Sequence, residues 1–126
     1  MLKTIALLAC ASLASACAQT SAGGPQLSHD VFFTLHDRSD QAKAKLVQAC
    51  HRRLKGHQGE VFFSAGVLAQ DLTRDVNDRD FDVSLHIVFR TKADHDRYAV
   101  HERHTQFIKE NSASWKKVRV FDSYLK

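Results

Sequence analysis

Residues 29–35 read HDVFFTL, a run in which side chains alternate between the two sides of an extended backbone. Alternation with a period of two predicts a β-strand. One side carries the larger apolar set, namely His29, Val31, Phe33 and Leu35. The other side carries Phe32, so this strand is expected to lie in a sheet with apolar side chains on both faces.

Helical and extended segments follow one another in a simple order. Ser39 or Asp37 can cap a helix whose apolar stripe reaches Leu54, and Gly56 can end it. Further strands are predicted over residues 60–69, 82–90 and 118–124, and further helices from Thr91 to Val100 and over 102–111. The order βαββαβ predicts an α+β protomer with a ferredoxin-like fold and an antiparallel sheet.

Large apolar side chains recur on the second face of the predicted sheet. These are Phe32, Phe62, Leu68, Val88 and Phe121. Helices can cover only one face, and burying a large apolar side chain contributes about 1.5–3 kcal/mol. A second copy of the chain is the simplest cover, so a two-fold homodimer that closes into an α/β barrel is expected.

The first 18 residues have the layout of a secretory signal: Lys3, then an apolar run, then small residues. Residues 16–18 offer an Ala-x-Ala cleavage site. Residues 14–17 resemble a bacterial lipobox, in which Cys17 would be lipidated. The sequence predicts an exported, periplasmic protein, with two alternatives open: simple cleavage or lipid anchoring to the membrane. Residues 19–27 then form a flexible tether, and residues 28–126 form the domain.

Composition excludes several classes of partner. The formal net charge is +4, with basic and acidic residues intermixed and no basic block of the kind that binds nucleic acid. The sequence has no glycine-rich phosphate loop, so no nucleotide is expected and no cofactor is predicted. Cys50 falls on the apolar stripe of the first helix, which favours a buried, inert thiol over a reactive one.

Polar residues that could carry chemistry gather in the second half of the chain. His101 and His104 are three residues apart on a predicted helix, and with His86 or Asp122 they could hold a metal ion. This spacing alone is a weak metal motif, and no metal ligand is assigned. A different interpretation places Tyr98, His104 and His29 around one cavity with Asp122, as an acid–base site or as a polar network that stabilises the fold.

The chain resembles the stress-responsive dimeric α/β-barrel (Dabb) family from residue 29 to residue 124. The resemblance rests on His29 at the head of the first strand, on Asp82, Leu85 and Phe89, on Tyr98-x-x-His101-x-x-His104, and on Val120-Phe121-Asp122. The family usually has proline after the first histidine of the Tyr-x-x-His-x-x-His segment, where this chain has Glu102.

The resemblance implies a dimeric barrel of ferredoxin-like protomers. One plant member is a polyketide cyclase, and its catalytic residues match Tyr98 and His104, a pocket histidine matches His29, and the aspartate that supports the catalytic histidine matches Asp122. The ligand pocket would also include Val31, Phe33 and His101.

Three functions are therefore considered. The first is a stress-related protein with an apolar pocket that binds a small aromatic or polyketide-like ligand. The second is a cofactor-independent enzyme, polyketide-cyclase-like or monooxygenase-like, in which His104 acts as the base, oriented by Asp122, and Tyr98 and His29 polarise a carbonyl group. The third is a metal-binding protein.

Overall fold

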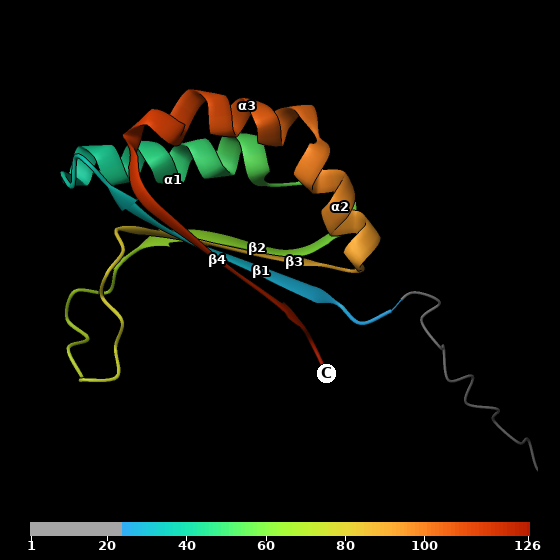
Figure 1. Cartoon of the computed structure of the whole chain (residues 1–126), viewed down its shortest axis with the longest axis horizontal. Helices are drawn as coiled ribbons and strands as arrows, with labels where there is room; N and C mark the ends of the chain where they lie inside the picture. The colour runs from blue at the N-terminus through green and yellow to red at the C-terminus, as the bar shows by residue number, and fades with distance from the viewer. Residues whose placement is uncertain (1–23) are drawn as a thin grey trace, which may run out of the picture.

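The computed structural model describes residues 24–126 and forms one four-stranded antiparallel sheet with helices on one side (Figure 1). The strands are β1 (Leu27–Leu35), β2 (Glu60–Val67), β3 (Val83–Phe89) and β4 (Trp115–Tyr124). The helices are α1 (Asp40–Leu54), α2 (Lys92–Val100) and α3 (Glu102–Asn111), with a short 3₁₀ turn, η1 (Ser112–Ser114), before β4. The predicted βαββαβ order and ferredoxin-like α+β class are confirmed.

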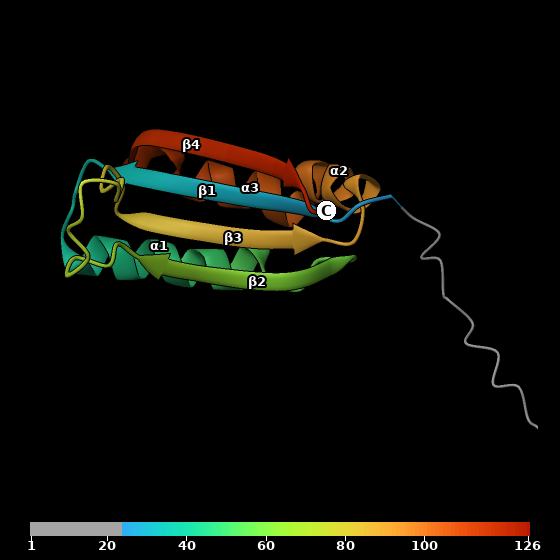
Figure 2. The ribbon, with the colours of Figure 1, turned by 90° about the horizontal axis from the view of Figure 1, so that it is seen from below.

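The strand order is β2-β3-β1-β4, so the first and third strands lie at the centre of the sheet (Figure 2). The predicted signal and Cys17 lie outside the described residues. Within residues 24–126, every helix is too short or too polar to cross a membrane.

Element boundaries follow local chemistry. The side chain of Ser39 accepts a hydrogen bond from the Ala42 amide at the start of α1, as predicted, and Gly56 adopts φ +79° just beyond its end. The last strand begins at Trp115, three residues before the predicted start. Its first residues, Trp115-Lys-Lys, lack a clear alternation, but they pair with Thr34 and Leu35 across a register shift.

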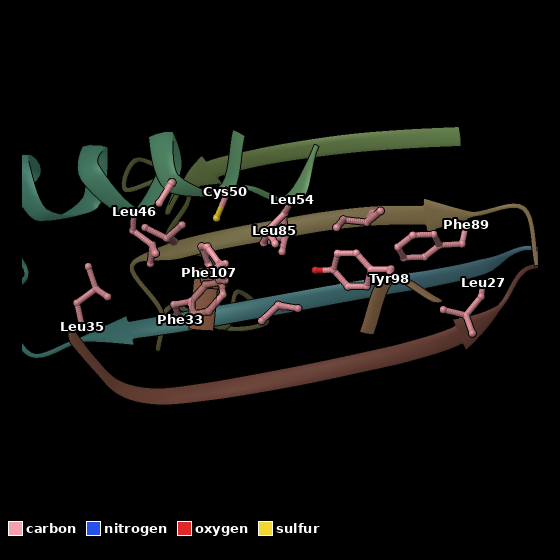
Figure 3. Close-up of a cluster of buried hydrophobic side chains, with 14 residues drawn as sticks. Leu27, Phe33, Leu35, Leu46, Cys50, Leu54, Leu85, Phe89, Tyr98 and Phe107 are labelled. Carbon is pink, nitrogen blue, oxygen red and sulfur yellow. The ribbon is translucent and has the colours of Figure 1, made fainter. Parts of the chain in front are cut away.

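The core lies between the sheet and the helices (Figure 3). Alternate residues of β1 and β3 point into it, including Val31, Phe33, Leu85 and Phe89, and α1 contributes Leu46 and Leu54. Cys50 is fully buried in this core, and burial raises the pKa of its thiol to about 12. The expectation that this thiol is buried is confirmed, and its raised pKa favours an inert thiol.

The opposite sheet face is left uncovered by the helices (Figure 2). Cross-strand pairing places Val88 opposite Phe62, and Phe121 opposite Asp30, on this face. Phe62 and Phe121 are each 53 % exposed. The prediction that large apolar side chains occupy a second sheet face is therefore confirmed for these residues.

Helix α2 is held on the sheet by a close approach at its first turn. Gly59 has φ +83°, and a Cβ atom there would lie 2.1 Å from Cγ of Asp94, so only glycine fits. The buried Asp94 carboxylate accepts hydrogen bonds from Thr91 Oγ1 and from Arg97. This contact fixes the position of α2, which carries His95 and Tyr98.

Candidate functional site

Tyr98 is the centre of the polar cluster between the sheet and the helices. Its side chain is 2 % exposed and packs against Phe89, with ring centroids 5.0 Å apart. The hydroxyl oxygen points away from Phe89, toward Leu85 and Leu54 (Figure 3). Burial raises the pKa of Tyr98, and the phenol is therefore neutral.

Four imidazoles surround the phenol ring. The ring centroids of His104, His57, His29 and His95 lie 4.6, 5.0, 5.8 and 6.2 Å from that of Tyr98. Burial lowers the pKa of His29, His57 and His104 below the ordinary value for histidine. These three rings are therefore neutral near pH 7, and each keeps one nitrogen that accepts a proton or a hydrogen bond.

The backbone fixes the tautomers of two of these rings. His104 Nδ1 lies 2.9 Å from the carbonyl oxygen of Ala99, and His57 Nε2 lies 3.0 Å from that of Arg53. A carbonyl oxygen can only accept, so these nitrogens carry the protons. The free lone pairs are therefore on Nε2 of His104 and on Nδ1 of His57.

His29 forms a hydrogen bond with a carboxylate on the neighbouring strand. Its Nδ1 atom lies 2.6 Å from Oδ1 of Asp122, because the β1–β4 register places the two residues directly opposite each other. His29 is 9 % exposed, whereas the Asp122 side chain is 46 % exposed at the sheet edge. Burial dominates the pKa of His29 and lowers it, although the bond to Asp122 opposes the shift.

The predicted pair of Asp122 with His104 is wrong. Asp122 binds His29, and His104 is oriented by the Ala99 carbonyl at the end of α2. The sequence could not show this, because the pairing depends on strand register. Asp122 does share a side of β4 with Val118 and Val120, as predicted, but the helices do not cover this edge strand and all three side chains remain partly exposed.

His101 does not line the interior. It lies in the turn between α2 and α3, is exposed, and its Nδ1 accepts a hydrogen bond from the Arg103 amide as the N-cap of α3. The proposed metal set of His101, His104 and His86 is also not assembled, because His86 lies on the other sheet face, where its Nδ1 is 2.6 Å from Asp30 Oδ1. The absence of proline at Glu102 leaves α3 starting where predicted.

Val31 and Phe33 lie on the helix-covered face, where the resemblance places a ligand pocket. In this structure both are packed in the core, with exposures of 5 % and 2 %. A surface hollow lies elsewhere, between α1 and the end of β2, lined by Lys43, Ala44 and Val67 among others. The interior around Tyr98 is thus closed in this conformation, and the pocket remains a prediction.

Two histidines of the cluster were missed by sequence reasoning. His95 precedes Tyr98 by three residues on α2, a spacing that places both side chains on one helix face. This signal was available in the sequence. His57 lies in the loop after α1 and gave no periodic signal.

Comparison with known proteins gives a consistent family and fold. The sequence model of the stress responsive A/B barrel domain (Dabb) matches residues 27–125. No curated protein matches the chain.

Solved structures share the fold at low sequence identity. A Dabb family protein with a ferredoxin-like fold from Mesorhizobium loti superposes with a TM-score of 0.68 at 18 % identity, covering 82 % of this chain and 99 % of that one. A dimeric ferredoxin-like protein from Thermobifida fusca gives 0.67 at 11 % identity, covering 81 % and 92 %. A hydroxynitrile lyase from Passiflora edulis gives 0.65 at 18 % identity, covering 81 % and 94 %.

Proposed function

The chain belongs to the stress-responsive A/B barrel domain family, and from this premise we propose that it binds a small molecule at Tyr98. The observation that carries the proposal is the Tyr98 hydroxyl. It lies in an apolar interior, points toward Leu54 and Leu85, and forms no hydrogen bond with any residue in the described part of the chain. The hydroxyl therefore keeps its donor free, and an oxygen of a ligand in the neighbouring apolar space could accept it in a hydrogen bond that contributes about 0.5–1.5 kcal/mol.

The surroundings define the class of ligand. Apolar side chains from the sheet, α1 and α3 would contact the apolar part of the ligand. These side chains are Val31, Phe33, Leu54, Leu85 and Phe107. One hydroxyl at the end of an apolar space fits a small aromatic or polyketide-like compound with a carbonyl oxygen. The ligand enters from the side of His104, which is only partly buried, when the closed interior opens.

Binding of aromatic carbonyl compounds to the full chain, measured by calorimetry, tests this proposal. Tyr98→Phe is expected to weaken the affinity about 3- to 10-fold, because one hydrogen bond contributes about 0.5–1.5 kcal/mol. Tyr124→Phe is the matched control, since Tyr124 is half-exposed at the end of β4. Equal affinity of Tyr98→Phe and the unmodified chain would contradict the proposal.

A second candidate is a cofactor-independent enzyme that transfers a proton on such a ligand, and the His29–Asp122 pair favours it. Asp122 accepts the Nδ1 proton, so Nε2 of the neutral His29 has a free lone pair that can take a proton from a bound carbonyl compound. The Tyr98 phenol would donate to the carbonyl oxygen. Turnover that is lost in Tyr98→Phe and in His29→Gln, with the fold retained, would favour this candidate over binding alone.

Two further elements belong to the proposal. The uncovered sheet face, with Phe62 and Phe121 half-exposed, is buried against a second copy of the chain. Two similar structures are described as dimeric, which supports self-association. The domain acts after export to the periplasm, with Cys17 as a candidate lipid anchor. Cell fractionation and mass analysis of the mature N-terminus test export; an unprocessed cytoplasmic chain would contradict it.

A further inference from the structure

Three potential metal ligands converge at the sheet edge next to the Tyr98 cluster. One ligand atom each from His29, His95 and Asp122 can be chosen so that all three atoms lie within 4.8 Å of one another. We propose that His29, His95 and Asp122 bind a divalent transition-metal ion of the zinc class. This site is separate from the Tyr98 hydroxyl and goes beyond the ligand binding proposed above.

The residue types fit the ion. Two imidazoles and one carboxylate are the protein ligands of many zinc sites, and such a set leaves further positions for water or a bound molecule. The three residues come from β1, α2 and β4, so each is held by a regular element of the fold. The His29–Asp122 part of the set follows from cross-strand register and is therefore well positioned without the ion.

The immediate surroundings also fit. The second ring nitrogen of a metal-binding histidine usually faces a carboxylate or carbonyl group. Nδ1 of His95 lies 3.5 Å from Oδ1 of Asp96, and Asp96 is itself bound by Lys92 at 2.6 Å. The rings of His29 and His95 have centroids 5.0 Å apart, which brings one nitrogen of each ring within reach of a single ion beside Asp122.

Access and proton balance are satisfied as well. The Asp122 side chain is 46 % exposed and that of His95 is 19 % exposed, so an ion can enter from solvent at this edge. The ion replaces the proton that His29 Nδ1 donates to Asp122. If Nδ1 is the ligand atom, the imidazole stays neutral by carrying its proton on Nε2, and Asp122 stays ionised. The site then has a net charge of one positive unit.

Titration of the metal-free full chain with Co²⁺, followed by displacement with Zn²⁺, tests the proposal through the visible absorption of bound cobalt. We expect one ion for each chain, with a spectrum of nitrogen and oxygen ligands. His95→Gln and Asp122→Asn are expected to weaken binding by on the order of 100-fold, at least as much as loss of an outer partner of a metal ligand. Two variants on different elements protect the test against a single folding failure, which circular dichroism would detect.

His86→Gln is the matched control, because His86 forms a second histidine–aspartate hydrogen bond of the same length on the other sheet face. It is expected to keep full metal affinity. Tyr98→Phe should also keep it, which separates this site from the proposed ligand site. The proposal is overturned if the unmodified chain binds no cobalt, if His95→Gln binds as tightly as the unmodified chain, if His86→Gln loses the ion, or if the spectrum shows a cysteine thiolate ligand.

Discussion

Two histidine–aspartate pairs lie back to back on the same sheet. His29–Asp122 faces the helices and His86–Asp30 faces the uncovered side, and the Nδ1–Oδ1 distance is 2.6 Å in both. His29 and Asp30 are consecutive residues of β1, so alternation along one strand sends them to opposite faces.

The surroundings of the two pairs differ far more than their bonds. The inner pair lies beside Tyr98 and His95, and burial lowers the pKa of His29. In the outer pair, Asp30 also accepts a hydrogen bond from Ser28 Oγ, and the ring of Phe32 packs against His86. The same kind of histidine–aspartate pair therefore differs in its expected role. On the helix-covered face it is a candidate reactive or metal-binding group, whereas on the uncovered face it is a polar pair surrounded by aromatic side chains.

The largest effect is expected from a charge on the outer face. Phe121→Asp should raise the dimer dissociation constant about 100-fold or more, because burying each large apolar side chain contributes about 1.5–3 kcal/mol and a two-fold dimer contains two copies. Sedimentation velocity over a concentration series measures this. Val100→Asp is the control, since Val100 is exposed at the end of α2. If both variants dissociate equally, the uncovered face is not the interface.

A smaller effect is expected from deleting each histidine in turn. In the Phe121→Asp background, where the outer face stays exposed, His29→Ala should lower the free energy of unfolding by about 2 kcal/mol, because it leaves a cavity beside Tyr98. His86→Ala should lower it by less than about 1 kcal/mol, because its side chain is 36 % exposed. Urea unfolding followed by circular dichroism measures both. Equal losses of unfolding free energy in the two variants would contradict the expectation that His29 contributes more to stability than His86.

The smallest effect is the dependence of stability on pH. His29, His57 and His104 have pKa values lowered by burial from the ordinary value of 6.5. Below pH 6.5 the unfolded chain therefore binds more protons than the folded chain, so stability is complete above 6.5 and declines as the pH falls toward the folded pKa values.

Urea unfolding at about pH 7.5 and about pH 5.5 measures this difference. The loss of unfolding free energy on acidification should be smaller in His29→Gln than in the unmodified chain, because this variant lacks one of the three histidines whose pKa is lowered. Stability that stays constant or increases at the lower pH would contradict the burial of these rings.

Local patterns predicted the fold more completely than the site. Helix α3 spans Glu102–Asn111 as expected, because its apolar spacing and flanking residues specify a helix without reference to the rest of the chain. The partner of Asp122 could not be predicted in the same way. Its position opposite His29 is set by the β1–β4 register, which results from packing of the whole sheet.

Tyr98, His104 and His29 do come together, as the sequence predicted. Their roles remain predictions, and so does the pocket. The structure also places His95 in this cluster, which was not predicted. The pattern of a helix shows which of its residues share a face, but it does not show which strand residues that face contacts. His101, assigned to the pocket by resemblance, instead caps α3.

Gly59 has a consequence for how this sequence can change over time. Any side chain at position 59 would overlap the Asp94 carboxylate, and Asp94 holds the first turn of the helix that carries His95 and Tyr98. A smaller residue at 94 would remove this overlap, but it would loosen α2, and the φ of +83° would still disfavour any side chain at 59. Relatives that keep Asp94 should therefore keep glycine at 59.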